Sequence, residues 1–88
     1  MKVEFKSSFL KDVKKLKNKS LQNSIYNCIL QIESAPNVSS IKNIKKLRGF
    51  ETHYRIKIGD YRIGVKLENE VIYLVVFEHR KDIYKYFP

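Results

Sequence analysis

The sequence predicts a single α+β domain in which two N-terminal helices pack on one face of a curled, mainly antiparallel sheet of four strands. Three observations support this prediction: helical spacing of apolar residues over 9–32, strict alternation over 54–67, and a continuous apolar run over 71–77. No internal repeat or linker-like segment divides the 88 residues. We therefore expect one domain over residues 1–88, with the element order β-α-α-β-β-β.

The first half of the chain predicts one short strand and two helices. Apolar and charged residues alternate over 2–6, which is typical of a strand, and Ser7 or Ser8 is placed to cap the helix that follows. Ser20 is placed to cap a second helix, which Pro36 ends. The apolar positions that share one face are Phe9, Val13 and Leu16 in the first helix, and Leu21, Ile25, Cys28, Ile29 and Ile32 in the second.

The second half predicts three strands after a polar segment. Residues 37–48 are polar and basic, and we expect them to form an ordered connector. Alternation over 54–58 and 61–67 indicates two strands joined by the two-residue turn Gly59-Asp60. The run over 71–77 is apolar on both faces, as expected of a central strand. Residues 81–87 are expected to form one helical turn or to stay extended.

The two-residue turn fixes how the side chains of its strands are paired. Lys57 then lies opposite Arg62 and Arg55 lies opposite Gly64, while the apolar residues share the other face. A like-charge pair across strands costs up to about 1 kcal/mol, and no acidic residue alternates among these cations on either strand. We also expect Gly64 to leave a gap beside Arg55. A phosphate bound between the strands would relieve the repulsion, so we favour a functional surface here over an ordinary solvated sheet face.

The composition narrows the class of protein. Eighteen Lys and Arg against nine Asp and Glu give a net charge of +9, which attracts nucleic acid or an acidic protein. The only cysteine, Cys28, excludes an internal disulfide, and its place in an apolar stripe predicts a buried, inert thiol. One cysteine and two distant histidines make no zinc site, so we expect no metal and no cofactor. A charged N-terminus and the lack of a membrane-length apolar run predict a cytoplasmic protein without a membrane partner.

A second group of candidate residues follows the central strand. Arg80 carries a fork of donors suited to phosphate. Tyr84 is suited to stack on a base or donate a proton, but it would equally pack the tail onto the sheet. His79 is the one side chain here suited to acid/base chemistry near neutral pH, although a lone histidine is more often a hydrogen-bonded surface residue. His53 has a weaker claim, because it stands at a strand start with nothing beside it.

Three segments of the sequence together resemble the RelE/ParE toxin superfamily. They are KLRG over residues 46–49, YRIKIGDYRI over residues 54–63, and HRKDIY over residues 79–84. With the two amphipathic helices before them, the resemblance covers nearly the whole chain. It implies a toxin of a type II toxin–antitoxin pair, and RelE-type members of this superfamily cleave mRNA in the ribosomal A site.

The resemblance also implies a set of catalytic residues. The family's basic and tyrosine active-site positions fall on Arg55, Lys57, Arg62, Arg80 and Tyr84, with His79 as a further candidate. Cleavage would be attack of a ribose 2′-OH on the adjacent phosphate, which leaves a 2′,3′-cyclic phosphate and a 5′-OH without a metal ion. Arg62, helped by Arg80, would neutralise the phosphate, and Lys57 would be the general base. Arg55 would position the backbone or share the task of general base. Tyr84 would stack on or orient a nucleotide, and His79 is a candidate donor to the leaving 5′-oxygen.

The expected partners follow from the same resemblance. They are a cognate antitoxin and mRNA in the ribosomal A site, with contacts to 16S rRNA. Operator DNA is expected to be contacted only through the antitoxin complex. The antitoxin would supply an acidic amphipathic segment that crosses the basic residues or displaces the tail. Further contacts to RNA are assigned to Lys45, Lys46, Arg48 and Lys81.

Two other functions fit the same composition. The ParE branch shares the fold but poisons DNA gyrase and cuts nothing; because it generally lacks the full basic set, Lys57, Arg62 and Tyr84 favour the nuclease. A non-catalytic nucleic-acid-binding module would explain the net charge by phosphate contacts alone. The gyrase poison would stop DNA replication before translation, and the binding module would produce no cyclic-phosphate ends.

Overall fold

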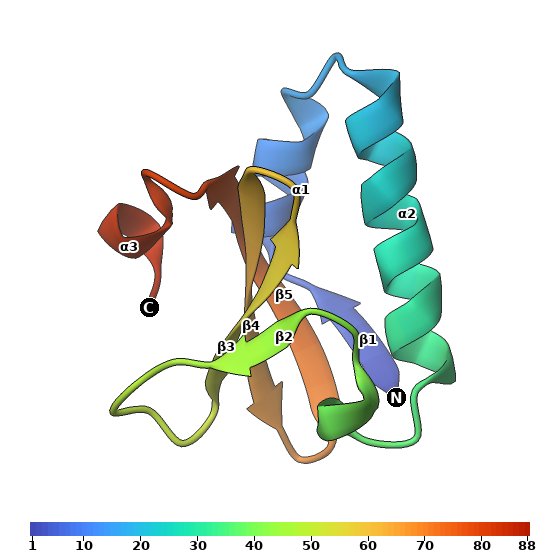
Figure 1. The fold of residues 1–88 in the computed structure, drawn as a ribbon, viewed down its shortest axis with the longest axis vertical. Coiled ribbons are helices and arrows are strands. Elements are labelled where there is room, and N and C mark those ends of the chain that lie inside the picture. The colour runs from blue at the N-terminus through green and yellow to red at the C-terminus, as the bar shows by residue number, and fades with distance from the viewer.

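One mixed sheet organises the computed structural model, which describes residues 1–88 (Figure 1). The strands are β1 (Lys2–Phe5), β2 (Ile44–Lys46), β3 (His53–Ile58), β4 (Tyr61–Glu68) and β5 (Val71–His79). Their order across the sheet is β1-β5-β4-β3-β2, and only β1 and β5 pair in parallel. The predicted α+β class is confirmed, but the predicted number of four strands is wrong, because the sheet has five.

The additional strand is β2, which lies within the segment interpreted as a connector. Its sequence of one isoleucine and two lysines is too short to show a strand period. It forms because β3 presents an unpaired edge, on which Ile44 pairs with Ile56 and Lys46 pairs with Tyr54. Short, lysine-rich edge strands of this kind resist pairing with other chains.

Three α-helices and a short 3₁₀ helix complete the fold. They are α1 (Ser7–Lys14), α2 (Lys19–Ser34), η1 (Val38–Ser40) and α3 (Ile83–Tyr86). No helix is both long enough and apolar enough to cross a membrane. The predicted serine caps are wrong. Lys6 precedes α1 without a side-chain cap, and the Ser8 hydroxyl instead donates to the Val75 carbonyl. Asn18 caps α2, and its side-chain oxygen accepts from the Leu21 amide at 3.0 Å.

The core lies on both faces of the sheet. Figure 1 shows α1 and α2 on one side and α3 on the opposite side. The larger cluster, between the sheet and the first two helices, contains Phe9, Ile25, Ile32, Ala35, Ile41, Ile56, Ile63, Val65, Ile72, Leu74 and Phe77. A smaller cluster beneath α3 contains Leu47, Val76, Ile83 and Phe87. The tail therefore forms the helical turn that was one of its two predicted conformations.

A β-bulge in β5 lets this strand serve both clusters. Gly64 pairs with Val76 and Val65 pairs with Leu74, which leaves Val75 as the additional residue. As a result Leu74 and Phe77 pack toward α1 and α2, whereas Val76 packs beneath α3. The bulge therefore explains why the sequence of β5 is apolar on both faces.

We predict that Ile63→Ala removes most of the stability of the domain. Ile63 is fully buried at the centre of the larger cluster, and truncation of such a residue costs about 2–5 kcal/mol. A domain of this size has a net stability of roughly 3–5 kcal/mol, so urea denaturation should show a transition shifted to very low denaturant. Leu10→Ala, at a position that is 53% exposed, is the control and should change stability by less than about 0.5 kcal/mol. Equal losses in the two variants would contradict this view of the core.

Candidate functional site

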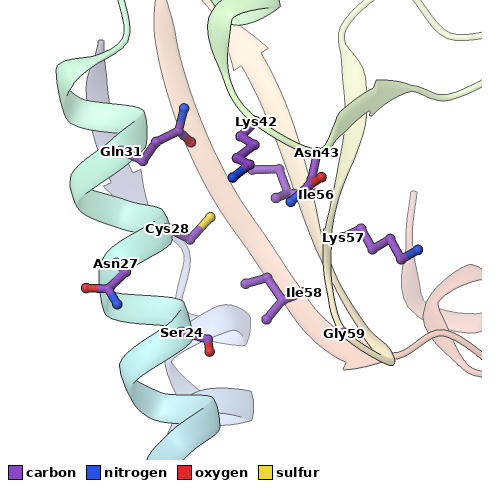
Figure 2. Close-up of a pocket in the computed structure, with 10 residues that line it drawn as sticks. All are labelled: Ser24, Asn27, Cys28, Gln31, Lys42, Asn43, Ile56, Lys57, Ile58 and Gly59. Carbon is purple, nitrogen blue, oxygen red and sulfur yellow. The ribbon is translucent and has the colours of Figure 1, made fainter.

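The side chains of the β3–β4 hairpin divide between the two faces of the sheet. The predicted register is confirmed: Lys57 pairs with Arg62, Arg55 with Gly64, and Ile56 with Ile63. Figure 2 shows Ile58 directed toward α2 and Lys57 directed away from it. We call the side opposite α1 and α2 the basic face; its members on the three adjacent strands are Lys45, His53, Arg55, Lys57, Arg62, Gly64 and Lys66.

The cations at the centre of the basic face are not neutralised. None of Arg55, Lys57 and Arg62 forms a salt bridge, because the four salt bridges of the molecule are made by Lys2, Lys46, Lys66 and Lys85. Paired positive charges without carboxylates leave a strong local field, which favours binding of an anion. The like-charge pair predicted from the sequence is therefore present and uncompensated.

Arg62 is held in place by the turn that precedes it. Its Nη1 donates to the Gly59 carbonyl at 3.0 Å and to the Tyr61 carbonyl at 2.9 Å. These bonds fix the plane of the guanidinium and leave Nη2 and Nε free to donate to a ligand. A guanidinium that is fixed in advance loses little side-chain entropy when it binds a phosphate.

A pocket of about 270 Å³ opens beside this row of cations. It is lined by Lys45, Lys46, Leu47, Arg48, Arg55 and Tyr84. The structure thus brings three residues assigned to RNA contact together with two assigned to catalysis. Tyr84 comes from α3 and the others from β2, β3 and the loop between them. A tyrosine ring beside several cations is the combination that binds single-stranded nucleic acid.

The remaining predicted residues are less closely gathered. Arg80 is exposed and follows β5, and its backbone amide donates to the Asp60 carbonyl at 2.8 Å, which places it beside the β3–β4 turn. Lys81 is also exposed, on the loop before α3. His79 pairs with Tyr61, and their rings meet edge to face at 5.3 Å on the side of the sheet that carries α1 and α2. Its Nδ1 accepts from the Lys81 amide at 3.1 Å. The His79 ring therefore does not share the basic face with Lys57 and Arg62.

His53 lies on the basic face, although its place at a strand start made it only a weak candidate. It occupies the same side of β3 as Arg55 and Lys57. Its ring lies 5.1 Å from Phe50 and 5.5 Å from Phe87, measured between ring centroids. Extending the alternation of 55 and 57 back by two residues would have found it.

The predicted gap beside Arg55 does not exist. The ring of Phe87 fills the space above Gly64, and a Cβ added at Gly64 would lie 2.6 Å from that ring. The glycine is therefore required by the tail that folds over the strand, not by a ligand. The sequence could not show this, because residues 64 and 87 are distant along the chain.

Glu78 is the cross-strand partner of Arg62, a pairing that the hairpin sequence alone does not show. Its carboxyl forms no ion pair with Arg62 and lies instead beside Asp12 of α1 and Lys15, which follows that helix. Burial raises the pKa of Glu78 above 4.5, and the negative charges of Asp12 and Asp82 raise it further. Asp12 itself accepts from the Phe77 amide at 2.9 Å. No three His, Cys, Asp or Glu side chains lie close enough together to hold a metal ion.

A separate groove of about 370 Å³ lies between α2 and β3 (Figure 2). Ser24, Cys28 and Gln31 line it from the helix, and Ile56 and Ile58 line it from the strand. Burial raises the pKa of the Cys28 thiol to about 11. The thiol is half-buried, and its raised pKa favours the protonated, unreactive form that the sequence predicted.

Comparison with protein families gives one match along most of the chain. Residues 3–84 match the family described as ParE toxin of type II toxin-antitoxin system, parDE. The chain is also 36% identical over 89 residues to Toxin RelE3 of Methanocaldococcus jannaschii, with the full length of both proteins covered.

Solved structures show the same fold. The RelB-RelE antitoxin-toxin complex from Methanococcus jannaschii contains a chain that is 33% identical, with a TM-score of 0.77 over 96% of this chain and 98% of that one. A chain of the archaeal RelE-RelB complex from Pyrococcus horikoshii is 21% identical, with a TM-score of 0.74 over 93% and 97%. The isolated E. coli RelE toxin is 23% identical, with a TM-score of 0.65 over 89% and 82%. The last two likenesses concern the fold alone.

We predict that Cys28 reacts slowly with thiol reagents in the folded protein. A pKa raised from 9.0 to about 11 leaves about 100-fold less thiolate near neutral pH. The rate of alkylation by iodoacetamide at pH 8 should be lower by at least this factor than in 6 M guanidinium chloride. Equal rates in the folded and unfolded protein would contradict burial of the thiol.

We predict that Glu78→Gln stabilises the protein at neutral pH. A folded-state pKa above the unfolded value means that Glu78 favours folding at low pH and that this contribution is lost as the pH rises through the raised pKa. Because Glu78 is only half-buried, the gain at pH 7 should be small, from a few tenths to about 1 kcal/mol. Urea denaturation between pH 4 and 7 should show the two proteins diverging as the pH rises. The same pH dependence in both would show that Glu78 ionises normally.

Proposed function

Because the chain belongs to the RelE/ParE toxin superfamily and is a toxin of a type II toxin–antitoxin system, we propose that it is an endoribonuclease that cleaves mRNA in the ribosomal A site. The observation that supports this proposal most strongly is the row of unneutralised cations, Arg55, Lys57 and Arg62, beside a basic pocket that contains Tyr84. Cleavage would inhibit translation.

The proposed reaction is an internal transfer within RNA. A ribose 2′-oxygen attacks the adjacent phosphorus, the bond from phosphorus to the 5′-oxygen of the next nucleotide breaks, and the products are a 2′,3′-cyclic phosphate and a 5′-OH. A proton leaves the 2′-OH and a proton reaches the 5′-oxygen. Negative charge grows on the phosphate oxygens, so fixed donors that face them lower the barrier.

The residues divide these tasks by their positions. Arg62, which the turn holds in a fixed plane, neutralises the phosphate through its free Nη2 and Nε. Lys57, directly opposite, is the candidate general base for the 2′-OH. Arg55 holds the RNA backbone, and the exposed ring of Tyr84 stacks on a nucleotide in the pocket. Arg80 assists from the loop after β5, and Lys45, Lys46, Arg48 and Lys81 bind RNA outside the scissile phosphate.

His79 keeps a smaller part in this proposal. Its ring packs on Tyr61 on the side of the sheet that carries α1 and α2, so we assign the proton for the leaving oxygen to solvent water and not to His79. Its contact with the Lys81 amide instead orders the loop that carries Arg80. None of the remaining groups is a strong acid or base, which suits an enzyme whose substrate is positioned by the ribosome.

We propose two macromolecular partners. One is a cognate antitoxin, as in the solved complexes of RelB with RelE, with an acidic segment that matches the basic face; operator DNA would be contacted only through that complex. The other is the ribosome, through 16S rRNA. Because the chain matches the ParE toxin family, poisoning of DNA gyrase is the alternative to mRNA cleavage.

We predict that Arg62→Ala lowers the rate of mRNA cleavage by about 100-fold or more, because a preorganised donor to the developing charge is lost. Mapping of 5′-OH ends after brief induction of the toxin, with and without active translation, measures this directly. Lys11→Ala, which removes an exposed cation on α1, is the matched control and should cleave like the unaltered protein.

Three outcomes decide the proposal. New 5′-OH ends that require translation and disappear in Arg62→Ala support it. Arrest of DNA replication with an SOS response, and no new ends, would assign the protein to gyrase inhibition. Salt-sensitive RNA binding without new ends would assign it to a non-catalytic binding module.

A further inference from the structure

The short helix α3 cannot hold its own conformation. It comprises Ile83–Tyr86, and a single helical turn is unstable in water without tertiary contacts. Its two buried side chains tie this segment to the sheet: Ile83 is 1% exposed and Phe87 is 3% exposed. Tyr84 and Tyr86, between these two anchors, are 65% and 61% exposed. The position of Tyr84 therefore depends on its buried neighbours.

The ring of Phe87 occupies a socket on the sheet that exists only because residue 64 has no side chain. The floor of the socket is Gly64, where three ring atoms of Phe87 lie 2.6–2.9 Å from the place of a Cβ. One wall is the ring of His53 at 5.5 Å, and Leu47, Val76 and Ile83 complete the same cluster. Glycine inside a strand weakens it and calls for a reason. Close approach of the Phe87 ring is that reason here.

The socket lies directly beside the basic pocket. Gly64 is the cross-strand partner of Arg55, and Arg55 lines the pocket together with Tyr84. Leu47 belongs to both the socket cluster and the pocket lining. A ring seated on Gly64 therefore sets how far α3 stands from Arg55, which in turn sets the width of the pocket.

We propose that Phe87 and Gly64 form a positioning device that holds Tyr84 over the RNA-binding pocket. Phe87 touches no substrate in this arrangement and acts only through the placement of Tyr84. The proposal deepens the proposed nuclease function and depends on that function for its kinetic consequence. Its structural part, the dependence of Tyr84 on the socket, stands without it.

The structural part is tested first, by a measurement that needs no RNA. The protein is labelled with 3-fluorotyrosine, and the ¹⁹F resonance of Tyr84 is identified by its loss in Tyr84→Phe. Phe87→Ala removes the ring, and Gly64→Ala places a methyl group where the ring sits, so both should move the Tyr84 resonance toward that of free fluorotyrosine. Lys11→Ala, which alters an exposed residue of α1 on the opposite side of the sheet, should leave it in place. An unmoved Tyr84 resonance in both socket variants would overturn the proposal.

The kinetic part is tested by a double-mutant cycle on ribosome-dependent cleavage. Loss of base stacking by Tyr84→Ala should reduce cleavage about tenfold or more. Phe87→Ala should cause a similar loss by itself and almost no further loss in the Tyr84→Ala background. Phe87→Leu, which keeps an apolar side chain in the socket, should restore much of the activity.

The cycle distinguishes a loss of cleavage caused by misplacement of Tyr84 from one caused by unfolding of the domain. If Phe87→Ala acted only by destabilising the domain, its effect would persist undiminished in the Tyr84→Ala background, and the proposal would be wrong. Thermal unfolding of each variant shows whether it is folded at the assay temperature. If Phe87→Ala is not, Gly64→Ala, which displaces the ring without truncating it, takes its place in the cycle. If the unaltered protein produces no 5′-OH ends, the proposed nuclease function fails, while the ¹⁹F result still decides whether the socket positions Tyr84.

Discussion

The register of the β3–β4 hairpin is the constraint on which the rest of the molecule depends. A slip of one residue would carry the cations of both strands into the core and bring Ile56 and Ile63 out to solvent. Burial of each isoleucine is worth about 1.5–3 kcal/mol, whereas the repulsion between Lys57 and Arg62 costs up to about 1 kcal/mol. The hydrophobic term wins by a wide margin, so the sheet holds the two charges together permanently. An anion that binds between the two side chains relieves this repulsion, which makes its binding more favourable.

The two faces of the sheet differ in how firmly they are covered. The side of α1 and α2 carries the larger cluster, and its helices are two and four turns long, so it forms the stable part of the domain. The side of α3 carries four buried residues, and one helical turn closes it. The pocket beside Tyr84 thus has one rigid wall, made of β2 and β3, and one wall that depends on a few contacts. Such an arrangement would let the pocket adapt to a ligand without disturbing the hairpin.

The local pattern of apolar and polar residues predicted most of the fold. The features that it did not predict depend on contacts between residues far apart in the sequence. The alternation of Tyr54, Ile56 and Ile58 with charged residues, together with the Gly59-Asp60 turn, was enough to give the register of the hairpin correctly. The strand β2 was missed because three residues show no period and because its formation depends on an edge supplied by β3. The gap at Gly64 was misread because its occupant, Phe87, lies far along the chain.

The candidate site was predicted to a similar extent. Residues on the hairpin could be assigned to a face, so Arg55, Lys57 and Arg62 were placed together. Beyond the hairpin, the faces depend on the bulge at Val75, which no period in the sequence reveals. For this reason His79 was expected near the phosphate but lies on the other side of the sheet, and Glu78 was not expected beside Arg62. Tyr84 could be named from a motif, but its place in the pocket needed the folded tail.

The parallel pairing of β1 with β5 affects how the protein folds. Val3 and Phe5 find their partners only in Ile72 and Leu74, so β1 cannot join the sheet until the distant strand β5 is in place. Helices α1 and α2, made in between, have no finished surface to cover until then. Contacts so far apart in sequence slow folding and make it cooperative. The sheet and the helices that cover it therefore form as one cooperative unit, and not one after the other.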